Sequence, residues 1–233
     1  MKKKILSIAL AVAILAIASI GTLAYFTETT PKKDNVFTVG NVHIALDENF
    51  DENTANLVPG SKTTTAIPKQ VFLENTGLND AYVRVHIAIP SILDNAQPDF
   101  DASRNVLHFN NSNMATGQWN WSTTLVRPDG DYTQNNNWNF YTTTIGGISY
   151  NVYVVTYETK LAHGEKTPAA MDQVYLDAGT TQNDIARINQ VLTNGWHMYV
   201  VAEAVQAAGF SDAFSAFAAS FKTIGSYNPF VAP

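Results

Sequence analysis

Alternation of apolar and polar side chains with a period of two residues is the strongest constraint on how this chain of 233 residues folds. The clearest case is Tyr82–Ile89, in which the odd-numbered residues are apolar, whereas Arg84 and His86 fall on the opposite face. Successive side chains of a β-strand point to opposite faces of its sheet, so this segment predicts a strand with one face in the core and one in water. His86 is therefore expected to be a surface residue and not a metal ligand.

Other segments carry the same pattern or are apolar on both faces, and these are further strand candidates: Val36–Val39, Val42–Leu46, Gln70–Glu74, Tyr150–Tyr157 and Trp196–Ala202. Two stretches instead repeat apolar residues at helical spacing, Ile185–Leu192 and Phe214–Phe221. Candidate N-terminal caps precede or open them, namely Thr181 or Asn183 for the first and Ser211 or Asp212 for the second. Many short strands with few helices predict a mainly β protein, an antiparallel jelly-roll-like β-sandwich with a few short appended helices.

The first 24 residues have the layout of a secretory signal peptide. Lysines occupy positions 2 to 4, Ile5–Ile20 is apolar apart from two serines, and Gly21 then breaks the helix. Small residues at the −3 and −1 positions favour cleavage between Ala24 and Tyr25. An uncleaved membrane anchor is the alternative, because Ile5–Phe26 has about the ~20 residues needed to span a bilayer.

Charge and composition exclude several function classes. Three of the 14 Lys and Arg residues lie in the signal segment, so the chain from Tyr25 carries 11 basic against 20 acidic residues, a net charge of −9. Nucleic-acid binding needs a basic surface and is not expected. The absence of cysteine rules out thiol catalysis and disulfides. The sequence also lacks zinc-protease, nucleophile-elbow and phosphate-loop motifs, so we expect no enzyme activity, no catalytic residue, no metal site and no cofactor.

Two segments leave alternatives open. The acidic stretch Asp47–Asn53 is expected to be a solvated loop after a strand, although its oxygen atoms also suit calcium. The segment 110–139 is rich in Asn, Thr and Trp and predicts a loop-like insertion. The aromatic residues in and just after it either fill the core or form an exposed stacking platform for sugars: Trp119, Trp121, Trp138, Phe140 and Tyr141.

The segment Tyr25–Val39 becomes the N-terminus after cleavage and favours an extended state, because it is rich in Thr, Val and Phe and poor in helix formers. An extended terminal peptide can pair within its own sheet or add to the open edge of a neighbour's sheet. The second outcome is a head-to-tail contact, which builds an open filament if its rotation does not close.

Several segments also carry a family resemblance. The junction Gly21–Thr27, followed by Asn35–Val42, resembles the SipW-dependent type of signal peptide and mature start, which belongs to the TasA/camelysin family of Gram-positive biofilm matrix proteins. Further similar pieces are spread across nearly the whole chain, within Val58–Gly60, Glu74–Val85, Thr156–Leu176 and Ala202–Phe210.

The resemblance implies a jelly-roll sandwich at 40–233, exported through a dedicated signal peptidase. It also implies fibres in which the N-terminal strand of one subunit completes the sheet of the next. Carried onto this chain, it places the donor strand within 25–39, with four anchor residues: Phe26, Val36, Phe37 and Val39.

The expected function is therefore that of a secreted structural protein of the cell surface or biofilm matrix of a Gram-positive bacterium. Its expected partners are copies of itself and the signal peptidase, with other matrix or cell-wall components as further candidates. A monomeric carbohydrate- or surface-binding jelly roll is the alternative. One branch of the family carries a metallopeptidase label, which makes a secreted metallopeptidase a remote third reading, since no zinc motif supports it.

Overall fold

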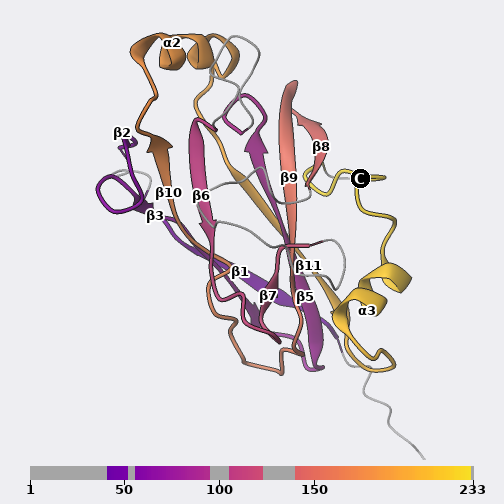
Figure 1. Ribbon diagram of the computed structural model, residues 1–233. Coiled ribbons are helices and arrows are strands. Elements are labelled where there is room, and N and C mark those ends of the chain that lie inside the picture. Colours follow the sequence, from indigo (N-terminus) through magenta and orange to yellow (C-terminus); the bar gives the residue numbers. More distant parts are fainter. Residues whose placement is uncertain (1–40, 52–55, 95–104, 123–139, 232–233) are drawn as a thin grey trace, which may run out of the picture. The chain divides into compact units, whose positions relative to one another are not determined.

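The computed structural model describes residues 41–51, 56–94, 105–122 and 140–231 (Figure 1). All of them belong to one compact unit, Gly40–Pro233. The expected signal peptide with its cleavage site at Ala24 and Tyr25 lies outside the described residues, as does the expected donor segment with Phe26, Val36, Phe37 and Val39. In the part of the chain that the structure describes, no helix has the length and apolarity that crossing a bilayer requires.

The first layer of the fold is an antiparallel sheet in the order β11–β5–β9–β7, with β8 also pairing with β9. Its strands are β5 (Ala81–Pro90), β7 (Trp119–Asn120), β8 (Phe140–Ile145), β9 (Ile148–Tyr157) and β11 (Tyr199–Gln206). The strand predicted at Tyr82–Ile89 is the core of β5, and the one predicted at Tyr150–Tyr157 is β9.

The second layer combines two smaller sheets. In the first, β1 (Ile44–Asn49) pairs antiparallel with β4 (Gln70–Asn75). In the other, β10 (Met171–Asp177) pairs with β2 (Pro59–Gly60), β3 (Ile67–Pro68) and β6 (Leu107–Asn111), the pair with β2 being parallel. The two sheets continue into each other, because the main-chain N–H groups of Ala170 and Thr167 donate to the carbonyls of Val71 and Leu73, at 2.9 and 2.8 Å.

One hydrophobic core fills the space between these layers. It contains the odd-numbered residues of β5 together with apolar side chains of β4, β6, β9 and β10. Its largest fully buried members include Trp119, Trp121, Tyr153 and Phe109. The predicted mainly β sandwich is thus confirmed, and Trp119 and Trp121 fill its core. The sugar-platform reading is wrong for these two residues, because aromatic rings within the core present no face to solvent.

Both predicted helices are present. Helix α2 (Gln182–Val191) begins after Thr181, whose hydroxyl accepts a hydrogen bond from the backbone N–H of Asp184, while the Asp184 carboxylate accepts from the backbone N–H of Thr181. This reciprocal capping box satisfies N–H groups that the first helical turn leaves without partners. Helix α3 (Ala213–Ser220) is capped by the side chain of Asp212, which accepts from the backbone N–H of Ser215. Helix α3 packs on the outer side of the first layer, against Tyr82 and Val205.

The prediction of a wet face on β5 is wrong. All ten residues of the strand are buried, including Arg84 and His86 at 4% and 0% exposure. Helix α3 and the C-terminal segment that follows it lie over this side of the sheet (Figure 1). The alternation of side chains therefore separates two buried environments, an apolar one between the layers and a polar one beneath the C-terminal segment.

Candidate functional site

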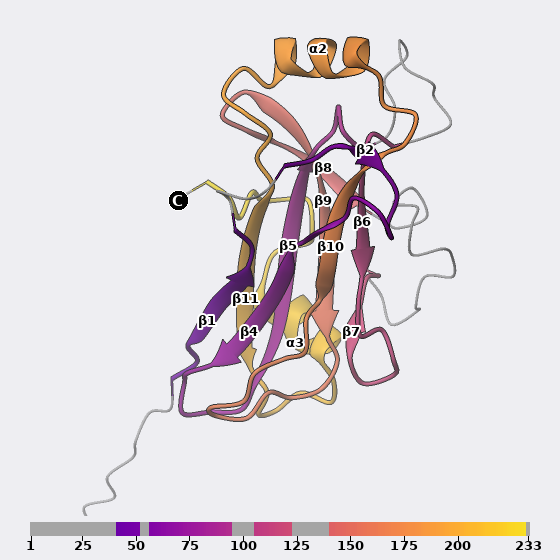
Figure 2. The ribbon, with the colours of Figure 1, turned by 90° about the vertical axis from the view of Figure 1, so that its left-hand side faces the viewer.

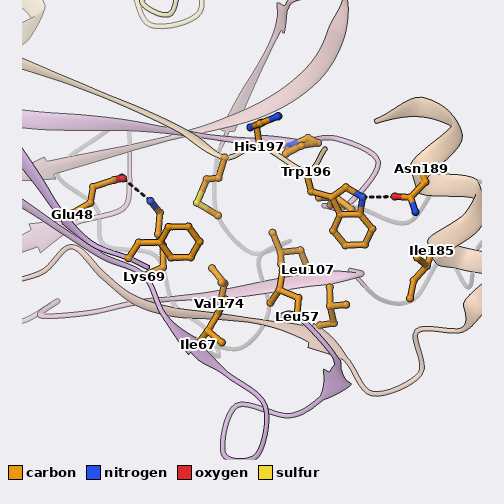
Figure 3. A pocket seen from close by; sticks show the side chains of 15 residues that line it. Glu48, Leu57, Ile67, Lys69, Leu107, Val174, Ile185, Asn189, Trp196 and His197 are labelled. Carbon is orange, nitrogen blue, oxygen red and sulfur yellow. Dashed lines mark hydrogen bonds and ion pairs between the residues drawn. The ribbon is translucent and has the colours of Figure 1, made fainter. Parts of the chain in front are cut away.

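An elongated pocket of about 610 Å³ opens at one end of the sandwich. We call it the end groove. It is lined where β1, β5 and β10 end, by residues that precede β11, and by helix α2. Figure 3 shows apolar side chains along its length, among them Leu57, Ile67, Leu107 and Val174. A concave apolar surface with a few polar groups is the usual form of a binding site.

Polar groups mark the two sides of the end groove (Figure 3). On one side, the Lys69 ammonium lies 2.6 Å from a carboxylate oxygen of Glu48 and 4.7 Å from the ring centre of Phe50. On the other side, the indole N–H of Trp196 donates to the side-chain oxygen of Asn189 at 2.8 Å. The Lys69 residue is only 6% exposed.

The Lys69–Glu48 pair favours a neutral hydrogen-bond acceptor as the ligand of this groove. A lysine ammonium carries three N–H donors, and among the described residues Glu48 takes one of them. Because Glu48 already neutralises the positive charge, an anionic ligand would meet carboxylate repulsion. A peptide carbonyl would not, so apolar walls with this pair suit an extended, largely apolar peptide.

Two edge strands flank the end groove. Within the described residues, β1 pairs with β4 alone and β11 with β5 alone, so each carries one open edge. Strand β1 ends at Asn49, next to Phe50 of the groove, and β11 begins at Tyr199, next to Met198 of the groove. Open strand edges present rows of N–H and C=O groups that can pair with another chain.

The acidic stretch expected as a solvated loop instead begins within strand β1. Its first three residues, Asp47, Glu48 and Asn49, are strand residues. The carboxylate of Asp47 pairs with Lys166 at 2.5 Å, and that of Glu48 pairs with Lys69. A lysine therefore pairs with each of the first two carboxylates of the stretch that the calcium reading required. Residues 52 and 53 lie outside the described part of the chain.

A second polar cluster lies on the outer face of the first layer, and we call it the Glu203 network. One carboxylate oxygen of Glu203 accepts from Arg84 Nε at 2.6 Å and from His86 Nε2 at 3.0 Å. The other oxygen accepts from the hydroxyl of Tyr227 at 2.7 Å. The Tyr227 oxygen in turn accepts from Arg84 Nη2 at 2.9 Å, and His86 Nδ1 lies 3.1 Å from the hydroxyl of Tyr141.

These contacts define the protonation states in the Glu203 network. A carboxylate only accepts, so His86 carries its proton on Nε2, and Nδ1 accepts from Tyr141. Burial lowers the pKa of His86, an effect that Glu203 only partly offsets, so the ring is neutral. Burial alone would raise the pKa of Glu203, but hydrogen bonds from His86 and Tyr227 and the charge of Arg84 lower it to about 2. Burial and the bond to Glu203 raise the pKa of Tyr227 to about 12.

The Glu203 network was missed at the level of sequence, since Arg84 and His86 were expected in water. A weak signal was available in the segment Ala202-Glu203-Ala204, where a charged residue interrupts an apolar strand. The register of β11 on β5 places Glu203 directly opposite Arg84, which is the cross-strand pairing of opposite charges that stabilises sheets.

The described residues do not fit a catalytic zinc ion. Such an ion takes three protein ligands, and in the described ranges no group of three or more His, Asp or Glu side chains is arranged to hold a metal. The pair of His86 and Glu203 lies against the guanidinium of Arg84, whose charge repels a cation. His108 and Asp177 lie 3.1 Å apart, but together they supply only two metal ligands, one fewer than a catalytic zinc ion takes.

Comparison with known sequences assigns the family. The sequence model of the camelysin metallo-endopeptidase family matches residues 1–186. No curated protein and no solved structure matches the chain. The matched range covers the N-terminal segment, the groove-lining parts of β1, β5 and β10, and most of the first layer, and it confirms the family resemblance seen in the sequence. The chain therefore belongs to the camelysin metallo-endopeptidase family.

Proposed function

We propose that this chain is a secreted structural protein of the cell surface or biofilm matrix of a Gram-positive bacterium. Subunits assemble head to tail, and segment 25–39 of one subunit fills the end groove of the next. The observation that carries the proposal is an apolar groove of about 610 Å³ that lies between two strands, each of which has an open edge within the part of the chain that the structure describes. A strand added there gains main-chain hydrogen bonds from an edge and apolar burial from the walls.

The energies are compatible with such an assembly. Each main-chain hydrogen bond contributes about 0.5–1.5 kcal/mol net, and burying an anchor such as Phe37 adds roughly 1.5–3 kcal/mol. Ordering the segment costs about 1–2 kcal/mol per residue. The balance favours association when several anchors are buried together and the free segment is already partly extended, which its composition favours.

We propose that the chain is not an enzyme, because its described residues offer no set of three metal ligands. The signal peptidase is its expected partner during export, and its own copies are its partners afterwards. Retention of the signal peptide would keep the donor segment at the membrane, so cleavage after Ala24 would also start assembly.

The first test compares two chains by electron microscopy and sedimentation, residues 25–233 and residues 40–233. The proposal expects filaments from the longer chain only. A mixture of the two adds a sharper test, because a subunit without its donor segment still offers a groove and ends the growing filament. Rising amounts of the shorter chain should therefore shorten the filaments. Filaments from residues 40–233 alone would refute the proposal.

A second test blocks the groove. Leu57 lines it, so Leu57→Trp fills part of its volume and should abolish filaments while the fold is retained. The neighbouring residue Val58 is 43% exposed and lies outside the lining, so Val58→Trp is the matched control. A labelled peptide of residues 25–39 should bind the control and not the blocked variant in fluorescence polarisation. Equal binding by both would exclude the end groove as the acceptor.

A further inference from the structure

The turn between β4 and β5 holds the residues that directly follow the proposed donor segment. The backbone N–H groups of Thr76 and Gly77 both donate to the carbonyl of His43, each at 2.9 Å. The N–H of Leu78 donates to the carbonyl of Asn41 at 3.1 Å and lies 3.2 Å from the side-chain oxygen of the same residue. Residues 41 and 43 are thus tied to one turn, which we call the tail anchor (75–79).

The tail anchor is itself held firmly. Asn75 is fully buried, and its side-chain amide donates to the carbonyls of Asn79 and Leu161, both at 2.8 Å. Its side-chain oxygen accepts from the N–H of Gly77 at 3.0 Å. His163 Nδ1 donates to the carbonyl of Gly77 at 2.7 Å. The turn is therefore bonded to the rest of the sandwich from several sides.

Gly77 is the residue that lets the two segments approach. A Cβ atom at this position would lie 2.5 Å from the backbone nitrogen of His43 and 2.6 Å from the carbonyl oxygen of Asn41. Both neighbours are backbone atoms, so any larger residue would push the segment 41–43 off the turn. Glycine is required here because the two chain segments lie too close together to leave room for a side chain.

The tail anchor and the end groove lie at opposite ends of the sandwich. Strand β1 starts near the anchor, where Ile44 pairs with Asn75, and ends near the groove, where Asn49 pairs with Gln70. Figure 2 shows this path along β1, with α2 beyond the far end. At about 3.3 Å per strand residue, the seven residues from Asn41 to Glu48 span roughly 23 Å.

This separation limits what a subunit can do with its own tail. Phe37 lies four residues before Asn41, a reach of at most roughly 14 Å, and Val39 lies closer still. While the anchor holds Asn41, neither side chain reaches the groove of its own subunit. Phe26, with a reach of roughly 50 Å, is not limited in this way.

We infer that the tail anchor, through Gly77, roots the donor segment at the end of the subunit opposite its own groove, so that Phe37 and Val39 enter only the groove of a neighbour stacked end to end. The inference rests on the proposed function and adds the residues that direct it. Rooting raises the local concentration of these two side chains at the neighbour's groove, and it prevents the subunit from closing its own groove with them.

Two changes to the chain 25–233 test the inference. The first inserts Gly-Ser-Gly-Ser between Gly40 and Asn41, which leaves the anchor intact but moves Phe37 and Val39 away from it. Its control carries the same insertion between Thr30 and Pro31, which lengthens the tail and keeps Phe37 and Val39 at their original distance. The second change is Gly77→Ala, with Leu78→Ala as its control, since the Leu78 side chain is 61% exposed and only its backbone binds Asn41.

The measurement is the critical concentration for filament formation by sedimentation, with circular dichroism as the check on folding. We expect the insertion after Gly40 and Gly77→Ala each to raise it at least tenfold, which corresponds to about 1.4 kcal/mol, and both controls to stay within twofold of wild type. If Gly77→Ala does not fold, the two insertions decide. If the insertion after Gly40 leaves the critical concentration at its wild-type value, the inference about the tail anchor is refuted, whereas the proposed strand donation is not. No filaments from the wild-type chain would refute strand donation, and the inference with it.

Discussion

Replacing Glu203 by Ala tests whether the Glu203 network stabilises the fold in solution. The change removes the acceptor for Arg84, His86 and Tyr227 at once. Arg84 then remains 4% exposed with no carboxylate to compensate its charge, and it keeps only its hydrogen bond to the Tyr227 oxygen and its contacts with the rings of Phe217 and Phe221 among its contacts described above. An uncompensated buried charge is among the most destabilising changes available to a protein.

Two independent arguments give the size of the effect. Removing one partner from a buried ion pair costs about 3–5 kcal/mol. The pKa of Glu203, lowered from 4.5 to about 2, corresponds to roughly 3 kcal/mol of preference for the ionised form in the folded state. Because the folded-state pKa is lowered, this contribution is present above about pH 4.5 and is lost as the pH falls toward 2. For a chain of this size, the destabilisation by Glu203→Ala lowers Tm by about 10 °C.

The assay is urea unfolding of residues 40–233, followed by circular dichroism so that assembly does not contribute. Asp47→Ala is the matched control, because its ion pair with Lys166 is equally short, but the two side chains are 60% and 44% exposed. Exposed pairs contribute little, so this control should unfold like the wild type. A loss below about 1 kcal/mol for Glu203→Ala would refute the reasoning, since it would mean that water reaches the network.

Three further predictions concern other parts of the fold. The pKa of His86 is lowered from 6.5, so the unfolded chain binds its proton first, and stability should fall as the pH drops below about 6.5; His86→Gln should flatten that slope in pH-dependent urea titrations. Trp119→Ala should cost about 3–5 kcal/mol in the same unfolding assay, because the ring is fully buried, whereas unchanged stability would favour an exposed ring. Thr181→Ala should cost about 1 kcal/mol through loss of the α2 capping box, with exposed Thr193→Ala as a control that leaves stability unchanged.

Local pattern was enough to locate strands β1, β4, β5 and β9 and both helices, but not β2, β3, β6, β7, β8 and β10. The period of two located β5, because a strand with a single apolar face has apolar side chains at alternate positions, and the run of apolar residues on both faces located β9. Capping chemistry narrowed each helix start to two candidates, since the side chains that satisfy free N–H groups are few, and the structure shows Thr181 as the cap of α2 and Asp212 as that of α3. The start of β11 was predicted too early, at Trp196, because apolar residues that line the end groove extend the alternation beyond the strand.

Three-dimensional contacts decided the rest. Helix α3 and Tyr227 lie more than 120 residues after Tyr82–Ile89 and cover Arg84 and His86, so that these residues form a buried network. No residue within Tyr82–Ile89 indicates this cover, and the segment therefore looks like a strand with one face in water. The end groove likewise joins residues from five strands and a helix, so no single segment carries its signature.

By itself, the sequence located strands β1, β4, β5 and β9 and both helices, and it identified the family, because each depends on residues close together in the chain. It also predicts an extended, strand-forming segment at 25–39. Tertiary structure alone decided which faces are buried, where the groove opens and that the tail anchor lies at the opposite end of the sandwich. The reason is physical. Burial and reach depend on distances between segments that meet only after folding.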